Sequence, residues 1–279
     1  MQLNLVKNMA DLQQALAGLR TQGSVGFVPT MGALHAGHAS LIKLAKERSK
    51  NVVVSIFVNP TQFGPNEDFT KYPKMLEKDM ETAKAAGASL VYAPSAGDIY
   101  PEGFSTSISA GNMNKILDGA FRPGHFDGVA TVVAKLLLRV VPQVAVFGEK
   151  DYQQLCVIRR VVQDLDLPVE IIAAPIMRET DGLAMSSRNA YLTPEERKTA
   201  PEIYKTLCET VKHIKAGMPH RQATAEGVDK LSSMGFKVDY LELHDAATLN
   251  SIESLERPAR LLVAAWLGGT RLIDNIAMG

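Results

Sequence analysis

The stretch FVPTMGALHAGHASLI, residues 27–42, runs from an apolar segment typical of a buried strand, through a turn with Gly32, into a segment with helical spacing. His35 and His38 lie three residues apart where the predicted strand gives way to the predicted helix. Side chains three positions apart share one face of a helix, so we expect both imidazoles to point the same way. The N-terminus of a helix also favours negative charge, which makes it a suitable place for a phosphate to bind.

The same alternation of strands and helices continues beyond this stretch. Residues 51–58, NVVVSIFV, are apolar on both faces, as in a central strand of a parallel sheet. Alternating strands and helices imply right-handed crossovers, so we predict an α/β fold with a Rossmann-like, doubly wound parallel sheet. Such a sheet binds its ligand at the carboxyl ends of the strands. The other predicted strands are 24–29, 89–94, 143–148 and 169–176, and the predicted helices are 38–50, 74–86, 128–140 and 151–165.

The pattern changes in the last third of the chain. Pro194 is predicted to open one long helix that runs to residue 215, and a second helix covers residues 221–233. The segments KVDYLELHD (237–245) and ARLLVAAWLGGTRLIDNI (259–276) are typical of strands. Helices followed by strands predict a smaller α+β domain, which would act as a lid. The expected domains are residues 1–178 and 179–279.

The composition is that of an ordinary globular protein, with 46% hydrophobic and 22% charged residues and a formal net charge of zero. A neutral chain lacks the electrostatic pattern of proteins that bind nucleic acid or anionic membranes, so we expect small-molecule partners. No stretch reaches the ~20 apolar residues of a membrane span, and polar residues interrupt the N-terminal segment, so no signal peptide is predicted. Cys156 and Cys208 lie far apart, as expected of two buried thiols in a reducing cytoplasm.

Four polar clusters follow predicted strands, on the side where a doubly wound sheet binds its ligand. Together they offer backbone N–H groups, imidazoles, neutral amides, a lysine and an arginine. Polyphosphates bind to such donors and cations, so the joint position of the clusters predicts a polyphosphate site. The clusters are Thr30, Met31 and Gly32 with the two histidines; Asn59 and Gln62; Lys150, Asp151 and Gln154; and Ser186, Ser187 and Arg188.

Each cluster taken alone has a simpler explanation. A histidine pair at a helix start often caps the helix; it could also bind a metal, although no third Cys or His ligand lies nearby in the sequence. Lys150 alone could be a solvated cation, and the SSRN turn alone could cap a helix. His125 is compatible with a ligand pocket and equally with a structural loop. The remaining histidines, His213, His220 and His244, are expected to be solvated or to cap helices.

Several motifs resemble known families. HAGH is similar to the His-x-Gly-His signature of the nucleotidyltransferase superfamily, which includes class I aminoacyl-tRNA synthetases. MSSR occupies the place of that superfamily's flexible loop, with Arg188 in place of its second lysine. Five longer blocks, in order, resemble the pantothenate synthetase family more closely. They are PTMGALHAGHASLI, SIFVNPTQFGPNEDFTKYP, FRPGHFDGVATVV, FGEKDYQQ and DGLAMSSRNAYLTPEER, and YLELHDAATL and RLIDNI extend the resemblance towards the C-terminus.

The resemblance implies an ATP-dependent ligase that condenses D-pantoate with β-alanine to pantothenate, a step of the coenzyme A pathway. In this family the pantoate carboxylate first attacks the α-phosphate of ATP, which releases pyrophosphate in the presence of Mg²⁺. The amine of β-alanine then displaces AMP from the resulting pantoyl adenylate. Because family members are usually homodimers, the resemblance also implies a homodimer.

The resemblance further implies roles for individual residues. His38 would be the proton donor, and His35 and Lys150 would be the other catalytic groups at the phosphates. The implied ATP-binding residues are Met31, Gly32, Ala33, Leu34, His35, Ala36, Gly37, His38, Gly148, Glu149, Lys150, Asp151, Met177, Met185, Ser186, Ser187 and Arg188; Gln62 and Gln154 would bind pantoate, Gln62 and Asn59 β-alanine, and Asp151 would lie near Mg²⁺.

Two other functions share parts of this pattern. A nucleotidylyltransferase for another small acid or a phosphorylated alcohol would also carry HAGH, but pantoate would drive no pyrophosphate release. A nucleotide-sensing or scaffold protein would keep the pocket without turnover. Pure binding would not require both histidines, both glutamines, Lys150 and Arg188 together, which favours an enzyme.

Overall fold

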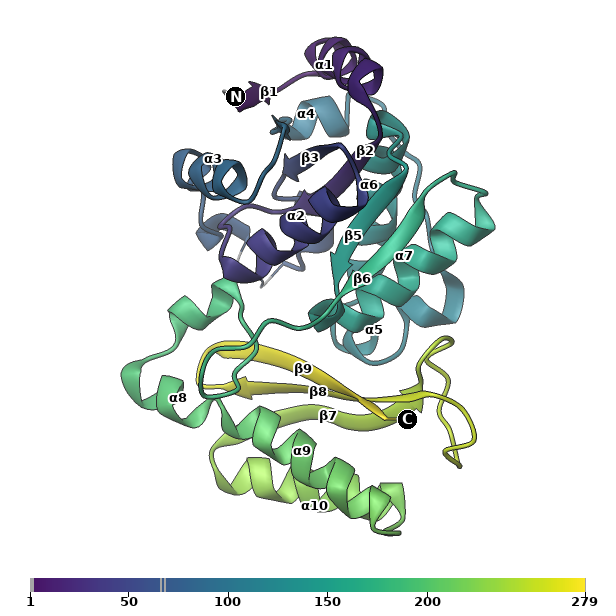
Figure 1. Ribbon diagram of the computed structural model, residues 1–279. Helices are drawn as coiled ribbons and strands as arrows, with labels where there is room; N and C mark the ends of the chain where they lie inside the picture. Colours follow the sequence, from purple (N-terminus) through teal and green to yellow (C-terminus); the bar gives the residue numbers. More distant parts are fainter. Residues whose placement is uncertain (1–2, 66, 68, 279) are drawn as a thin grey trace. The chain divides into compact units, whose positions relative to one another are not determined.

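The chain forms two compact units, shown in Figure 1 as a computed structural model in which residues 3–65, 67 and 69–278 are described. The chain passes into the C-terminal unit twice, first for residues 150–156 and again from residue 176 onward. The sequence-based division at residue 178 stays a prediction. The N-terminal unit comprises residues 1–149 and 157–175, and the C-terminal unit comprises residues 150–156 and 176–279.

The N-terminal unit is built on one six-stranded sheet. Its strands are β1 (Asn4–Val6), β2 (Val25–Thr30), β3 (Asn51–Ile56), β4 (Leu90–Tyr92), β5 (Val144–Gly148) and β6 (Glu170–Ala174). All neighbouring strands pair in parallel, in the order β1-β4-β3-β2-β5-β6, which confirms the predicted Rossmann-like α/β fold. The strand order reverses between β2 and β5. The segments after these two strands therefore leave the sheet at its switch point, where doubly wound folds bind ligands.

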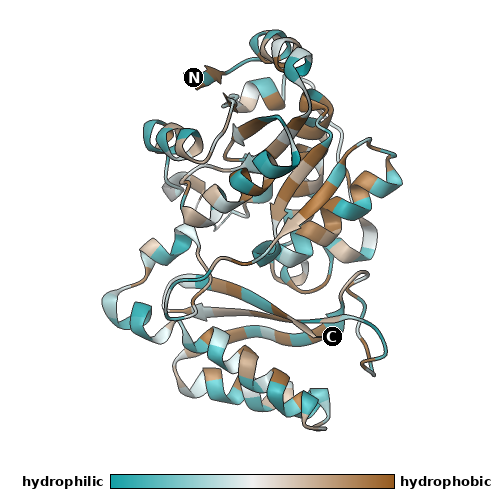
Figure 2. Cartoon of the chain, viewed as in Figure 1, coloured by the Kyte–Doolittle hydropathy of each residue, from teal (hydrophilic) through white to brown (hydrophobic). Residues whose placement is uncertain are grey.

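Helices cover both faces of this sheet (Figure 1). The helices along this part of the chain are α1 (Met9–Gln22), α2 (Ala36–Arg48), α3 (Leu76–Ala85), α4 (Ala96–Ile99), α5 (Asp118–Phe121), α6 (His125–Val140) and α7 (Tyr152–Asp164). On one face, Ile42 of α2 and Ala83 of α3 share a hydrophobic cluster with Val28 of β2. On the other face, Arg139 of α6 donates to Tyr92 Oη at 2.6 Å. The strands between these layers are largely hydrophobic (Figure 2).

The structure contains two N-terminal elements, β1 and α1, that the sequence did not predict. β1 has three residues and lies at the edge of the sheet beside β4, so it is too short to show a periodicity of its own. Asn8 caps α1, because its Oδ1 accepts the backbone N–H of Asp11 at 2.9 Å. The predicted helix at residues 128–140 begins earlier, at His125, directly after Gly124 with φ of 80°.

The C-terminal unit is built on an antiparallel sheet of β7 (Phe236–Asp245), β8 (Ala259–Leu267) and β9 (Thr270–Met278). Leu207 and Leu231, from the two long helices of this unit, share a hydrophobic core with Leu261 of β8. Helices packed on a small antiparallel sheet confirm the predicted α+β fold of this part of the chain. β8 and β9 form a hairpin, so the single predicted segment 259–276 contains two strands.

The prediction of one long helix from Pro194 to residue 215 is wrong. The structure has two helices, α8 (Pro194–Thr199) and α9 (Glu202–Lys215), with Pro201 between them. Pro201 has no N–H for the helical hydrogen bond and its ring crowds the preceding turn, so the helix ends and a new one begins. The second predicted helix is present as α10 (His220–Ser233).

The prediction that His244 is solvated or caps a helix is also wrong. The ring is buried on β7, where its Nδ1 lies 2.8 Å from Leu249 O and its Nε2 lies 2.8 Å from Glu242 Oε2. Both ring nitrogens therefore have structural partners.

Two further observations concern the thiols and the helices. Cys156 is buried, Cys208 is half-buried, and neither forms a disulfide bond within the described residues. Among residues 3–65, 67 and 69–278, no helix combines the length and the apolar character needed to cross a membrane.

Candidate active site

A carboxylate from α3 holds the loop that follows β2. Asp79 Oδ2 accepts the backbone N–H of Ala33 at 3.0 Å, and Asp79 Oδ1 accepts that of Leu34 at 2.7 Å. Gly32 has φ of +89°, and a Cβ there would lie 3.0 Å from Asp79 Oδ2, so the close approach favours glycine. Burial raises the pKa of the Asp79 carboxyl above its ordinary value, against the opposing effect of the two N–H groups. The sequence did not predict this role, because one acidic residue in a helix resembles any solvated one.

His35 and His38 cap the N-terminus of α2. His35 Nδ1 accepts the backbone N–H of Gly37 at 3.1 Å, and His38 Nδ1 accepts the backbone N–H of His35 at 3.3 Å. A neutral imidazole whose Nδ1 accepts a hydrogen bond carries its proton on Nε2. Both rings, with centroids 4.1 Å apart, are thus the same tautomer. The capping role and a role as donors are compatible, because they use different ring nitrogens.

Asn59, Gln62 and Met31 lie together in the N-terminal unit. Gln62 Nε2 donates to Met31 Sδ at 3.1 Å, and Asn59 Nδ2 donates to Gln62 Oε1 at 3.1 Å. Both amide side chains are buried. Because each contact requires one orientation of the amide, Gln62 presents its polar atoms in a defined direction. Asn66 and Asp68 of the NPTQFGPNED motif lie outside the described residues.

A charged cluster holds the backbone of Gln62. His125 Nδ1 lies 2.8 Å from Gln62 O, and Arg122 Nη1 lies 3.0 Å from His125 Nε2. A guanidinium can only donate, so His125 Nε2 accepts and its Nδ1–H donates to the Gln62 carbonyl. Burial, followed by the charge of Arg122, lowers the pKa of His125 to about 4, so the ring is neutral near pH 7. Of the two roles left open for His125, these contacts support the structural one.

The same cluster includes a half-buried ion pair that the sequence did not predict. Arg122 Nε lies 2.7 Å from Glu67 Oε1, and Arg122 Nη2 lies 2.6 Å from Glu67 Oε2. Burial raises the pKa of Glu67, but the hydrogen bond and charge of Arg122 outweigh it, so that pKa lies below its ordinary value. Arg122 belongs to the FRPGHFDG motif, and this motif was the sequence feature that could have pointed to Arg122.

Lys150 and Asp151 lie in a short turn, η4 (Glu149–Asp151), directly after β5. Lys150 Nζ is 3.8 Å from Asp151 Oδ1, and the Asp151 side chain is half exposed. The backbone carbonyl of Lys150 accepts a hydrogen bond from Asn275 Nδ2 at 3.0 Å. Gln154 follows one turn later, half-buried on α7. The sequence predicted Lys150, Asp151 and Gln154 as site residues, but not Asn275.

The segment after β6 forms a tight hairpin. Met185 N donates to Met177 O at 2.9 Å, so these two predicted residues pair across it. Ser186 Oγ accepts the backbone N–H of Arg188 at 3.2 Å and caps the short helix η5 (Ser187–Tyr191). The simpler explanation of the SSRN turn, helix capping, therefore holds for Ser186.

The predicted site residues are divided between the two units. Within the N-terminal unit the structure brings Met31, Asn59 and Gln62 together, and it pairs His35 with His38. Within the C-terminal unit it pairs Met177 with Met185. The N-terminal unit contains residues 31–38, Asn59, Gln62, Gly148 and Glu149, and the C-terminal unit contains Lys150, Asp151, Gln154, Met177 and residues 185–188.

Known proteins resemble the chain over its whole length. A family model described as pantoate-beta-alanine ligase matches residues 4–277. Pantothenate synthetase from Rhodospirillum rubrum is 54% identical over 279 residues, with 99% of each chain covered. The crystal structure of pantothenate synthetase from Thermus thermophilus superimposes with a TM-score of 0.93 at 46% identity, covering 98% of this chain and 99% of that one. Pantoate-beta-alanine ligase from Francisella tularensis, crystallised with beta-gamma ATP and beta-alanine, has a TM-score of 0.83 at 38% identity, covering 98% and 97%.

Proposed function

We propose a role for each residue of the site from the premise that this chain belongs to the pantoate–β-alanine ligase family, the pantothenate synthetases. The chain is an ATP-dependent ligase that condenses D-pantoate with β-alanine to pantothenate, through a pantoyl adenylate, and releases AMP and pyrophosphate. The observation that carries this conclusion is the 54% identity over 99% of both chains. The resemblance inferred from the sequence motifs is thereby confirmed.

The reaction must activate pantoate, because an unactivated carboxylate is a poor acyl donor to an amine. An oxygen of the pantoate carboxylate attacks the α-phosphorus of ATP, and the bond from that phosphorus to pyrophosphate breaks. Negative charge then builds on the oxygens of the α-phosphate and on the departing pyrophosphate. Donors held in place before the reaction stabilise this charge without having to reorganise.

The two histidines provide such donors. Their Nδ1 atoms are engaged by backbone N–H groups at the start of α2, which leaves the proton of each neutral ring on Nε2. We assign the Nε2–H of His38 to the charge that develops in adenylation, with His35 next to it on the phosphates. The turn over residues 31–38, which ends at the N-terminus of α2, would bind the rest of the triphosphate through backbone N–H groups.

Positive charge at the phosphates would come from Lys150 and Arg188. A guanidinium can bind two phosphate oxygens at once, whereas a lysine acts as a point charge. Ser186 and Ser187 precede Arg188 and would donate to the same phosphates. Gly148 and Glu149 would contact the nucleotide beside Lys150, and the paired backbones of Met177 and Met185 would contact its adenine side.

Neutral amides would orient the two acids. Gln62 and Gln154 would bind the hydroxyl and carboxylate groups of pantoate, because an amide orients a carboxylate without neutralising it as a nucleophile. Asn59, whose Nδ2 donates to Gln62 Oε1, would act with Gln62 on β-alanine. The amine of β-alanine then attacks the acyl carbon of the adenylate, the bond to AMP breaks, and the amine loses a proton.

Asp151 fits the requirement of a nucleotide-bound Mg²⁺. Within the described part of the chain, no group of three or more His, Cys, Asp or Glu side chains is suited to hold a metal. Mg²⁺ at a nucleotide needs only one or two carboxylates, because phosphate oxygens and water complete its shell. Asp151 offers one half-exposed carboxylate next to Lys150. Bound there with ATP, Mg²⁺ would neutralise phosphate charge.

The assembly and location of the chain are part of the same proposal. We propose a homodimer, by analogy with the family, and a cytoplasmic location, which two cysteines outside any disulfide bond support. Light scattering after size-exclusion chromatography tests the dimer, because a mass close to 30.3 kDa would show a monomer.

Pyrophosphate release tests the proposed function most directly. With ATP and pantoate but no β-alanine, we expect about one equivalent of pyrophosphate per active site, since the adenylate has no acceptor. Addition of β-alanine should convert this burst into continuous turnover. Pyrophosphate release that does not depend on pantoate would point to another nucleotidylyltransferase. Binding of ATP without pyrophosphate release would point to a nucleotide sensor.

A further inference from the structure

The RLIDNI motif near the C-terminus has no role in the proposed function so far, although Asn275 contacts the backbone of Lys150. It lies on β9 and carries two adjacent buried residues, Asp274 and Asn275. We propose that Asn275 and Asp274 are positioning residues, which hold Lys150 and the Met177–Met185 hairpin in the geometry that binds ATP. The inference rests on the proposed function of Lys150 and of this hairpin.

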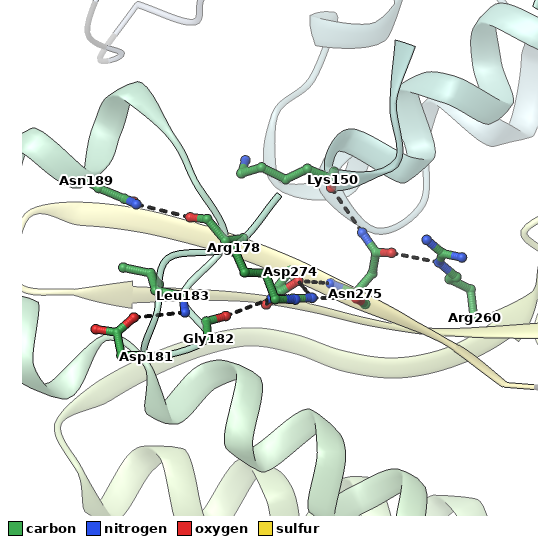
Figure 3. Close-up of polar contacts among 10 residues, drawn as sticks. Lys150, Arg178, Asp181, Gly182, Leu183, Asn189, Arg260, Asp274 and Asn275 are labelled. Carbon is green, nitrogen blue, oxygen red and sulfur yellow. Dashed lines mark hydrogen bonds and ion pairs between the residues drawn. The ribbon is translucent and has the colours of Figure 1, made fainter. Parts of the chain in front are cut away.

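Asn275 holds the backbone at Lys150. Its Nδ2 donates to the carbonyl of Lys150 at 3.0 Å, across 125 positions of sequence (Figure 3). Arg260 Nε donates to Asn275 Oδ1 at 2.7 Å, so the amide oxygen faces Arg260 and the amide NH₂ must face Lys150. Arg260 in turn lies 4.1 Å above the ring of Tyr152, the first residue of α7. The turn with Lys150 is therefore fixed from β8 and β9 at two points.

Asp274 holds the hairpin through Arg178. Arg178 Nη1 lies 2.6 Å from Asp274 Oδ2, and its Nη2 lies 2.9 Å from Asp274 Oδ1, in a two-pronged ion pair whose carboxylate is 0% exposed (Figure 3). Arg178 Nη1 also donates to Gly182 O at 3.0 Å, and its guanidinium lies 3.6 Å above the ring of Tyr204. Arg178 directly follows Met177, and it pairs with Ala184, so this ion pair fixes the base of the hairpin.

The two positioning contacts depend on adjacent residues of one strand. Successive side chains of a strand point to opposite faces of the sheet, so Asp274 and Asn275 act on different segments from the same place. Asn275 N also donates to Asp274 Oδ1 at 2.7 Å, which ties the two together. One strand thus connects the phosphate-binding lysine to the adenine-side backbone, although these lie far apart in sequence.

The same sheet contains a matched control. Arg271 Nε donates to Asp239 Oδ2 at 2.8 Å, and both side chains are largely buried. This Arg–Asp pair joins β9 to β7, and the proposed site includes neither of its residues. A substitution that breaks it should lower stability without a specific effect on ATP.

The test compares five variants of the full-length enzyme: Asn275→Leu, Asn275→Asp, Asp274→Asn, Asp239→Asn and Lys150→Ala. Asn275→Leu removes both amide contacts, whereas Asn275→Asp keeps the acceptor for Arg260, loses the donor to Lys150 and adds a negative charge. Asn275→Asp therefore serves if Asn275→Leu does not fold. Each variant is measured for the KM of all three substrates, kcat, calorimetric ATP affinity and melting temperature.

We expect the Asn275 and Asp274 variants to raise the KM for ATP about fivefold, as for the loss of one positioning hydrogen bond, and to weaken calorimetric ATP binding in parallel. The KM for pantoate and for β-alanine should change less than twofold, and Asp239→Asn should leave the KM for ATP unchanged. An ATP effect no larger than that of Asp239→Asn, while Lys150→Ala does weaken ATP binding, would overturn the positioning role alone. If Lys150→Ala itself leaves ATP binding and adenylation intact, the proposed function of Lys150 fails and the inference fails with it.

Discussion

The Nδ1 atom of His38 accepts the backbone N–H of His35 at 3.3 Å, so the ring caps α2 and carries its proton on Nε2. Asparagine at position 38 offers an oxygen close to the position of Nδ1, but it has no donor where Nε2–H lies. We expect His38→Asn to change the free energy of unfolding by less than about 1 kcal/mol. Adenylate formation should slow by about 10²–10³-fold, because a fixed donor to the transition state is lost.

Single-turnover formation of pantoyl adenylate checks this prediction. His38→Gln is the matched control, because its amide NH₂ reaches towards the Nε2 position while the cap acceptor is lost. It should retain more of the rate and less of the stability than His38→Asn. Near-normal single-turnover rates in His38→Asn would remove His38 from the chemistry.

A second prediction concerns Gln62, whose side chain is oriented by Asn59 and Met31. Gln62→Ala should weaken pantoate binding about tenfold or more, because hydroxyl and carboxylate groups lose their partner, and should weaken ATP binding far less. Isothermal titration calorimetry measures both affinities. Gln143→Ala is the control: Gln143 Oε1 accepts the backbone N–H of Val25 at 2.7 Å, at the amino end of the sheet. Equal losses for pantoate and ATP in Gln62→Ala would contradict the assignment.

A third prediction concerns Asp79, which accepts two backbone N–H groups from the turn after β2. Asp79→Asn places an amide NH₂ against one of these donors, so a buried N–H loses its partner. We expect urea unfolding to show a loss of about 1–3 kcal/mol and ATP binding to weaken, because the turn belongs to the proposed ATP site. Asp98→Asn is the control, since Asp98 Oδ2 accepts the N–H of Ser95 at an exposed helix start. If Asp79→Asn lowers stability and ATP affinity no more than Asp98→Asn does, the turn does not depend on Asp79.

The fold was predictable because its signals are local. The predicted strand at residues 51–58, which contains β3, is rich in apolar β-branched residues that would lie on both faces, as is typical of a buried parallel strand. The break at Pro201 was missed because PEERKT before it and EIYKTLCETVKHIK after it are both rich in residues that are common in helices, so the composition continues where the backbone cannot. His244 was missed because one of its partners, the carbonyl of Leu249, lies beyond the end of its strand, and a pattern within the strand does not show that the ring is buried.

The residues that orient the site were less predictable than the residues that form it. Lys150, Gln62 and the two histidines lie in blocks that resemble a family. Asp79 and Asn275 act on backbone groups that lie 45 and 125 positions away, and such contacts have no spacing that a sequence pattern could show. Only the folded chain brings Asp79 and Asn275 next to these backbone groups.

The last prediction concerns pH and His125, whose pKa burial and the charge of Arg122 lower from 6.5 to about 4. Between these two values the unfolded chain binds a proton at His125 and the folded chain does not. The contribution of His125 to the free energy of unfolding is therefore fully present above pH 6.5 and is lost as the pH falls towards 4. The loss should approach about 3 kcal/mol, the equivalent of that pKa difference.

Urea unfolding at pH values from about 4 to about 7 measures this effect against His125→Asn, which keeps a donor for the Gln62 carbonyl but does not titrate in this range. The wild-type free energy of unfolding should fall more steeply between pH 6.5 and about 4 than that of the variant, since all other titrating groups are shared. Parallel curves for the two proteins would mean that folding does not lower the pKa of His125, contrary to its contact with Arg122.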